Sequence, residues 1–125
     1  MKAIVVTDQA AGTAGMTLVE RPEPQAAIND VVVQVHASGF VPTELAWPST
    51  WTDRLDRDRT PSIPGHELAG VVTALGYGTT GLSVGQRVFG LTDWHRDGTL
   101  AEYVAVEARN LAPLPGDVEF TVGAS

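Results

Sequence analysis

The sequence contains no cysteine among its 125 residues. The chain therefore has no disulfide framework, no thiolate zinc site and no cysteine nucleophile. It also has no long apolar run. The apolar opening, residues 1–6, ends at polar Thr7 and Asp8, and nothing approaches the roughly 20 apolar residues of a membrane-spanning helix. These absences predict a cytoplasmic protein that does not bind a membrane.

Basic residues are scarce. Eight lysines and arginines stand against 15 acidic residues, which gives a formal net charge of -7. A nucleic-acid-binding surface usually needs a basic face that offsets phosphate charge, so this composition argues against a nucleic-acid partner. A chain of this length with 43% hydrophobic residues is long enough for one compact domain and too short for two of ordinary size.

Long helices are absent from the pattern as well, because proline and glycine interrupt almost every window in which a 3.6-residue period could develop. Between these breakers lie short runs rich in β-branched and apolar residues, which predict strands at residues 2–7, 16–20, 31–37, 68–75, 86–91 and 100–106. Only residues 43–47, which follow Pro42, and the tail from Asp117 have room for a helical turn. This pattern favours a mainly β, small antiparallel barrel over a doubly wound sheet.

One glycine pattern invites a different interpretation. Residues 76–81 fit Gly-x-Gly-x-x-Gly after an apolar run, and a dinucleotide-binding turn of that form opens a helix. Here the following residues 82–90 contain Gly85 and Gly90 and are rich in strand formers. We therefore predict a β-hairpin with glycine turns at this position instead of a phosphate-binding loop.

The most informative segment runs from Pro64 to Gly76 and reads PGHELAGVVTALG. A Pro-Gly turn precedes the pair His66-Glu67, and Gly70 follows three residues after the glutamate. Glycines allow close backbone approach or positive φ, so the pattern predicts a polar pair fixed at the start of a strand. It resembles the signature of the medium-chain dehydrogenase/reductase superfamily. Further segments fall in the order that this superfamily uses: residues 1–4, the strand 30–35, the turn 37–39, the hairpin 98–103 and the strand 111–115.

The resemblance implies a fold and a domain organisation. Residues 1–125 are identified as a GroES-like domain, a mainly β (α+β), partly open barrel with short helices that holds the substrate. In the superfamily a Rossmann domain follows and carries the dinucleotide. We expect that domain to be absent from this chain, which would stop at the start of the linker to it. NADPH would then be bound by the missing domain, the whole protein would be a homodimer, and the 125-residue chain alone would be inactive.

The branch of the superfamily depends on zinc ligands. Zinc alcohol dehydrogenases of this kind have a cysteine ligand where Val41 stands here, and a four-cysteine zinc lobe where residues 91–98 stand. Valine offers no lone pair, and catalytic zinc needs three protein ligands. The resemblance therefore implies a zinc-independent, quinone oxidoreductase-like enzyme that transfers hydride to a quinone, enone or carbonyl substrate.

Two alternatives to this function stay open. One is a zinc-dependent alcohol dehydrogenase fragment with an altered ligand set around His66 and Glu67, with Glu44 as a further candidate. The other is a free-standing GroES-like module that binds a partner or small molecule without chemistry.

Hydride transfer to a carbonyl needs a donor for the developing oxyanion and a source of a proton. The resemblance places Thr43 against the substrate oxygen, and the alternative for Thr43 is an N-terminal cap of its short turn. His66 has three possible roles: a hydrogen-bonded residue inside the barrel, a polar lining of the active site, or a metal ligand. Glu67, as a buried carboxylate, should be paired with Arg87, Arg109 or backbone donors.

The candidate catalytic residues are therefore Thr43, His66 and Glu67, and the candidate substrate-binding residues are Val41, Trp47 and Trp51. The two tryptophans would provide apolar walls for a planar quinone. Residues 51–60 alternate acidic and basic side chains, which is typical of a solvated loop. The functional alternative for this loop is a mobile flap over the pocket.

Overall fold

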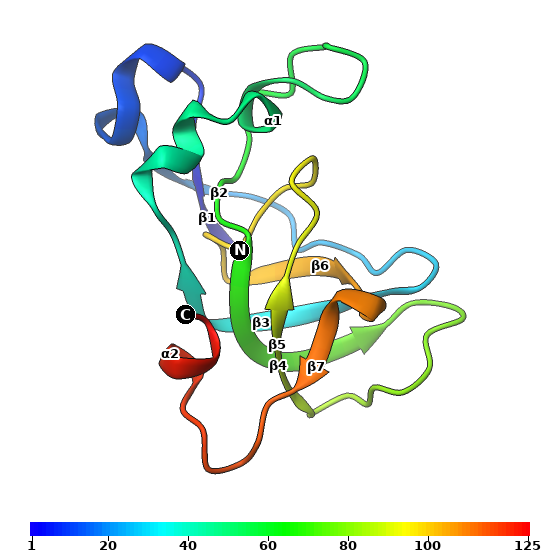
Figure 1. The fold of residues 1–125 in the computed structure, drawn as a ribbon. Helices are drawn as coiled ribbons and strands as arrows, with labels where there is room; N and C mark the ends of the chain where they lie inside the picture. The colour runs from blue at the N-terminus through cyan, green and yellow to red at the C-terminus, as the bar shows by residue number, and fades with distance from the viewer.

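The structure of the protein is a computed structural model that describes all 125 residues. Its strands pair in antiparallel fashion and form two sheets (Figure 1). The smaller sheet pairs β1 (Lys2–Val5) with β2 (Thr17–Glu20). The larger sheet has the strand order β6-β3-β4-β5-β7. Its members are β3 (Asp30–Gly39), β4 (Glu67–Leu75), β5 (Arg87–Leu91), β6 (Tyr103–Glu107) and β7 (Leu111–Pro113).

Backbone contacts of β1 join the two sheets. Ala3 forms a bridge with Ala101, and the N–H of Ile4 donates to the carbonyl of Leu100 at 2.8 Å. The segment just before β6 is thus tied to β1, and the two sheets together make a partly open barrel. This confirms the mainly β, GroES-like class that the sequence predicts.

Strand ends differ from the prediction by up to three residues, and two of the differences have a structural explanation. The predicted turn at residues 37–39 is wrong, because β3 continues to Gly39. Register shifts between Val32 and Val33 and between Val35 and Ala37 bend this long strand, so it changes direction without ending. Residues 100–102 lie outside β6 and contact β1 instead.

The core fills the inside of the larger sheet. It consists of seven buried side chains, six of them valine: Val31, Val33, Leu68, Val72, Val88, Val104 and Val106. Side chains alternate between the two faces of a strand, so every second residue of β3 and β6 reaches this core. Branched valine packs well on a pleated surface, which explains why the predicted strands form.

Helical segments are short. They are η1 (Gln9–Gly15), η2 (Pro42–Ala46), α1 (Pro48–Trp51), η3 (Ala108–Asn110) and α2 (Phe120–Gly123). The structure confirms the predicted turns after Pro42 and in the C-terminal tail, and a proline opens both η2 and α1. The sequence did not predict η1 or α1, because four to seven residues broken by glycine or proline carry no helical period. None of these helices has the length and apolar character that crossing a membrane requires.

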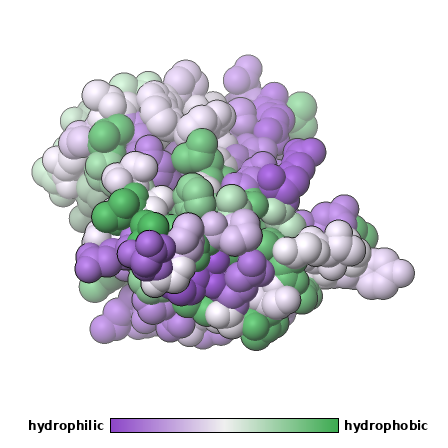
Figure 2. Space-filling model, turned by 60° about the horizontal axis from the view of Figure 1, so that its bottom comes forward, coloured by the Kyte–Doolittle hydropathy of each residue, from purple (hydrophilic) through white to green (hydrophobic).

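Residues 40–66 and 92–99 form what we call the loop layer, which contains η2 and α1 and lies beyond the end of the large sheet at which β4 begins (Figure 1). The C-terminal α2 lies near the same end of β3, where Ala124 packs on Ala69 and Leu114. Figure 2 views the molecule from another side and shows hydrophilic and hydrophobic residues interspersed over that face. His66 and Glu67 lie where the loop layer meets the sheet, at the start of β4.

Candidate functional site

His66 directly precedes β4, and Gly65 delivers it there. Gly65 has a φ of 91°, and a Cβ at this position would lie 2.6 Å from Oγ1 of Thr99. The backbone conformation and the available space both demand glycine. The Pro-Gly turn therefore fixes His66 at the start of a strand, as the sequence predicts.

His66 is buried in a polar and aromatic environment, with 3% of its side chain exposed. Its Nδ1 lies 2.9 Å from Oγ1 of Thr92, and its Nε2 lies 3.9 Å from Oε1 of Glu44. Burial, together with the nearby positive charge of Arg59, lowers the pKa of His66 to about 4 against the opposing effect of Asp93. The imidazole is therefore neutral near pH 7, so one ring nitrogen carries a proton and the other carries a lone pair.

Glu44 is the buried carboxylate of this region. Its Oε2 accepts from the N–H of Val41 and its Oε1 accepts from the N–H of Gly65, both at 3.2 Å. Burial raises the pKa of Glu44, although these two backbone donors oppose the rise. The sequence offered Glu44 only as a further metal ligand. The signal for its real position was an acid three residues into a turn, where it can cap the first N–H groups.

Glu67 is not where the prediction put it. Its side chain is exposed and makes no hydrogen bond or ion pair. Arg87 instead donates to the carbonyls of Pro115 and Val118, and Arg109 pairs with another glutamate. The reason is strand alternation: Leu68 points into the core, so its neighbour Glu67 must point outward. The expected pairing of a buried Glu67 with Arg87, Arg109 or backbone donors is therefore wrong.

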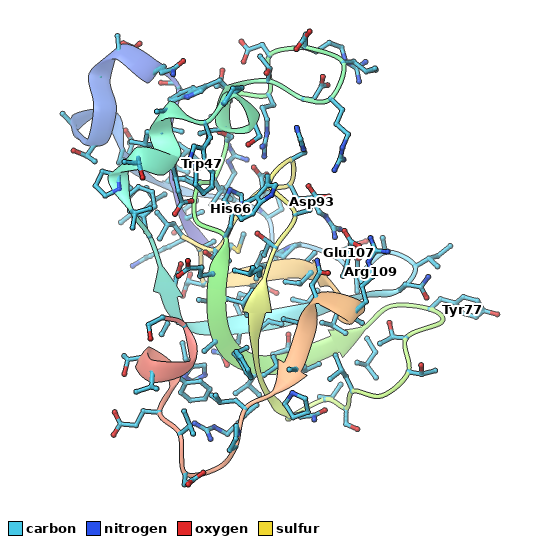
Figure 3. The ribbon with its side chains drawn as sticks, in the orientation of Figure 1. Trp47, His66, Tyr77, Asp93, Glu107 and Arg109 are labelled. Carbon is cyan, nitrogen blue, oxygen red and sulfur yellow. The ribbon has the colours of Figure 1, made fainter.

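The rings of two tryptophans lie against His66, and Figure 3 shows one of them, Trp47, beside it. The ring of Trp47 stacks on His66 with centroids 6.0 Å apart, and the ring of Trp94 meets His66 edge-on at 5.2 Å. Trp51 does not pack on His66. Its Nε1 donates instead to the carbonyl of Leu45 at 2.8 Å, which stabilises the turn that contains Leu45. The sequence missed Trp94, which lies in an irregular loop without periodicity.

Thr43 and Val41 are exposed on the turn that carries Glu44. The N-cap of η2 is Val41, so the alternative that Thr43 caps this turn is wrong. The Thr43 hydroxyl makes no hydrogen bond within the chain and is free to donate to another molecule. Its role toward a substrate remains a prediction.

Arg59 joins the two parts of the loop layer. Its side chain is 11% exposed, and its guanidinium donates to the carbonyl of Trp94 at 3.1 Å and also to the carbonyl of Ser49. It lies 3.6 Å from the carboxylate of Asp97. Residues 51–60, predicted as a solvated loop, thus contain one arginine that is turned inward and holds the segments bearing Trp47 and Trp94 together.

No three histidine, aspartate or glutamate side chains come together in an arrangement that could hold a metal ion. Of the alternative zinc ligands, the structure brings His66 and Glu44 together, and it leaves Glu67 on the surface. The glycine pattern at residues 76–81 connects β4 to β5, which pair antiparallel, and no helix follows it. The predicted hairpin is confirmed at that position.

A hollow of about 450 Å³ borders this site. It is lined by Thr92 and Trp94, which contact His66, and by Leu91 at the end of β5. Charged residues also line it: Arg54, Asp93, Glu107 and Arg109.

Known proteins resemble this chain over most of its length. A solved alcohol dehydrogenase superfamily protein from Novosphingobium aromaticivorans is 32% identical with a TM-score of 0.82, and the match covers 99% of this chain and 37% of the other. A solved quinone oxidoreductase from Pseudomonas syringae pv. Tomato is 27% identical with a TM-score of 0.84, with coverage of 98% and 36%. The L-threonine 3-dehydrogenase of Ruegeria pomeroyi is 30% identical over 136 residues, with coverage of 88% and 39%.

These solved oxidoreductases share the mainly β fold of this chain. Residues 27–116 match the alcohol dehydrogenase GroES-like domain, and the chain belongs to that family, within the medium-chain dehydrogenase/reductase superfamily. The chain spans about two fifths of the length of these relatives.

Proposed function

We propose that this chain is the substrate-binding domain of an oxidoreductase that transfers hydride from a nicotinamide coenzyme to a quinone, enone or carbonyl compound. The observation that carries the proposal is the buried, neutral His66 between Thr92 and Glu44, enclosed by Trp47 and Trp94. Aromatic walls suit a planar substrate.

The polar groups of the site match what the reaction needs. A carbonyl that accepts hydride becomes an oxyanion, which requires a hydrogen-bond donor and then a proton. The unpartnered hydroxyl of Thr43 would donate to this oxygen. Glu44, whose pKa is raised by burial, would hold a proton at a pH where an exposed glutamate has lost it.

This chain has no binding site of the usual kind for the phosphates of the coenzyme. Dinucleotide phosphates bind where a glycine-rich turn opens a helix, and the glycine turn here connects two strands. These residues therefore do not fit the phosphates, and we assign NADPH to a nucleotide-binding domain outside this chain, with a homodimer formed by the whole protein. When bound, the coenzyme supplies the hydride. The absence of a lone pair on Val41 supports a reaction without zinc.

Thr43→Val in the complete gene product tests this proposal, with Thr43→Ser as the control that keeps the hydroxyl. NADPH oxidation with 1,4-naphthoquinone should fall by about 10²–10³-fold in kcat in the valine variant and stay near wild type in the serine variant. The 125-residue chain alone should show no turnover. A gene product that oxidises no reduced nicotinamide with any quinone, enone or carbonyl compound would refute the proposal, and full activity of Thr43→Val would remove Thr43 from it.

A second candidate rests on the similarity to a threonine dehydrogenase. In that case the site would oxidise a hydroxyl substrate with zinc held by His66 and Glu44 together with a ligand from outside this chain. Metal analysis of the gene product separates the two candidates. Stoichiometric zinc that is lost in His66→Ala would favour the second, and activity that persists after dialysis against a chelator would favour the first.

A further inference from the structure

The hollow beside Trp94 combines exposed apolar side chains with two arginines that the proposed reaction does not use. Leu91 and Trp94 are 49% and 45% exposed, so large parts of two apolar side chains face solvent here. Arg54 and Arg109 line the same hollow. In Figure 3 the labelled residues run from Trp47 and His66 through Asp93 to Arg109, which shows how the aromatic site continues into this charged region.

The hollow is connected to His66 through Thr92. The Thr92 hydroxyl bonds to Nδ1 of His66, and the same residue lines the hollow. Trp94 likewise contacts His66 with its ring and borders the hollow. A molecule lying here would therefore rest against the outer side of the site proposed above.

Each arginine keeps donors free for a ligand. Nη2 of Arg54 donates to Asp93 at 2.8 Å, and Nη2 of Arg109 lies 2.7 Å from Oε2 of Glu107. A guanidinium has five N–H donors on three nitrogens, and these two contacts each use one nitrogen. The carboxylates thus hold both guanidinium groups in place without saturating them, and the side chains are 65% and 82% exposed.

The local charge also differs from that of the whole chain. Two arginines balance Asp93 and Glu107 in this hollow, whereas the chain carries a formal net charge of -7. The two guanidinium groups also border a larger hollow of about 790 Å³ that reaches the ion pair of Arg96 and Asp30. An anion would therefore meet less repulsion here than at an average point of the surface, because the field of a protein follows its local charges.

We propose that this hollow binds the acid group of an amphipathic organic anion, with a planar apolar ring on Trp94 and Leu91 and a carboxylate on Arg54 and Arg109. Guanidinium groups match planar carboxylates with paired hydrogen bonds. This inference rests on the proposed function and narrows its substrate class: the hydride acceptor is a conjugated or aromatic carbonyl compound that bears an acid group.

Binding of 2-naphthoate and 2-naphthamide to the chain tests this inference, because the two probes differ in charge and share the ring. Nuclear magnetic resonance follows the indole N–H signal of Trp94, assigned by its loss in Trp94→Phe. We expect both probes to shift this signal, with 2-naphthoate bound roughly five- to tenfold more tightly, since exposed charge pairs add modest affinity. The preference should weaken as salt concentration rises.

The double variant Arg54→Gln/Arg109→Gln should bring the affinities for the two probes within about twofold of each other and leave the affinity for 2-naphthamide unchanged. Arg57→Gln is the matched control, because Arg57 lies on the same loop, is 71% exposed and pairs with Asp53 away from the hollow. Equal affinities in the wild type, no shift of the Trp94 signal, or an anion preference that survives the double substitution would each overturn the inference. None of these outcomes bears on hydride transfer by the gene product, which the Thr43 experiment tests separately.

Discussion

The large sheet and the loop layer are held together by different forces. The sheet encloses seven aliphatic side chains that are at most 3% exposed. In the loop layer, individual side chains bond to backbone carbonyls instead: Thr50 donates to Glu44 at 2.8 Å, and Ser62 donates to Thr50 at 2.7 Å. Burial of apolar surface is nondirectional, whereas each of these hydrogen bonds depends on one donor in one place.

The difference explains where the site lies. A valine-rich sheet gives a rigid edge, and the loop layer places polar and aromatic groups against that edge. Functional residues commonly occur on loops that a rigid scaffold positions. The sheet should therefore determine whether the protein folds, and the loop layer should determine how the groups around His66 are arranged.

The largest difference in stability between the two regions should appear when a core side chain is removed. Leu68 is fully buried in the valine core. Leu68→Ala should lower the free energy of unfolding by about 2–5 kcal/mol, because it removes buried methyl groups and leaves a cavity. Leu55→Ala, at a side chain of the loop layer that is 71% exposed, should change it by less than about 0.5 kcal/mol. Urea unfolding measures both, and similar losses in the two variants would contradict this view of the core.

The second prediction concerns pH. In the unfolded chain His66 takes up a proton near its ordinary pKa of 6.5, whereas in the folded protein its pKa is about 4. Between these values the unfolded state binds more protons, so the free energy of unfolding falls as pH falls, by up to about 3 kcal/mol. Above pH 6.5 this contribution is fully present.

His66→Gln isolates that contribution. Glu44 acts in the opposite direction, because its pKa is raised in the folded protein and its carboxyl becomes less costly to bury as pH falls. Both proteins keep Glu44, so the difference between wild type and His66→Gln should shrink as pH is lowered from 6.5 to 4. Urea unfolding across this pH range measures it, and a difference that stays constant would show that His66 is not held neutral.

Most of the fold could be predicted from the sequence, because each strand is marked by the residue types of its own short segment. Valine runs between glycine and proline breakers mark the strands, and the glycines around His66 mark its position before β4. The error at residues 37–39 has a physical cause, since a bulge bends a strand in a way that residue types alone do not reveal.

Less of the site could be predicted, because it is built from contacts across the chain. Trp94 meets Trp47 only after the loop layer has folded. Arg59 stands in a run of alternating charge, and nothing in that run distinguishes it from Arg57, which is exposed. The sequence identified His66 and Trp47, and it missed Trp94 and the inward turn of Arg59.

Arg59 provides the third prediction. Arg59→Met keeps much of the apolar stem and leaves the carbonyls of Ser49 and Trp94 without their donor. The expected loss is about 1–3 kcal/mol, because hydrogen bonds that involve a charged group contribute more than those between neutral groups. The near-ultraviolet circular dichroism of the tryptophans should also weaken, because Trp94 would no longer be held against Trp47. Arg57→Met should leave both the spectrum and the stability near wild type. An equal effect of the two substitutions would show that Arg59 does not hold the segments of Trp47 and Trp94 together.

The smallest effect is expected at Glu67, the residue next to His66 in the sequence. Glu67→Gln should change the free energy of unfolding by less than about 0.5 kcal/mol, because its exposed carboxylate bonds to no other group. Glu44→Gln is the matched comparison: an amide has one acceptor oxygen, so either Val41 or Gly65 would lose a partner for its N–H. That loss should cost about 1–3 kcal/mol. Urea unfolding of the two glutamine variants shows which glutamate stabilises the folded site. A larger loss of unfolding free energy in Glu67→Gln would mean that the carboxylate beside His66 belongs to its neighbour in the sequence, against the strand alternation described above.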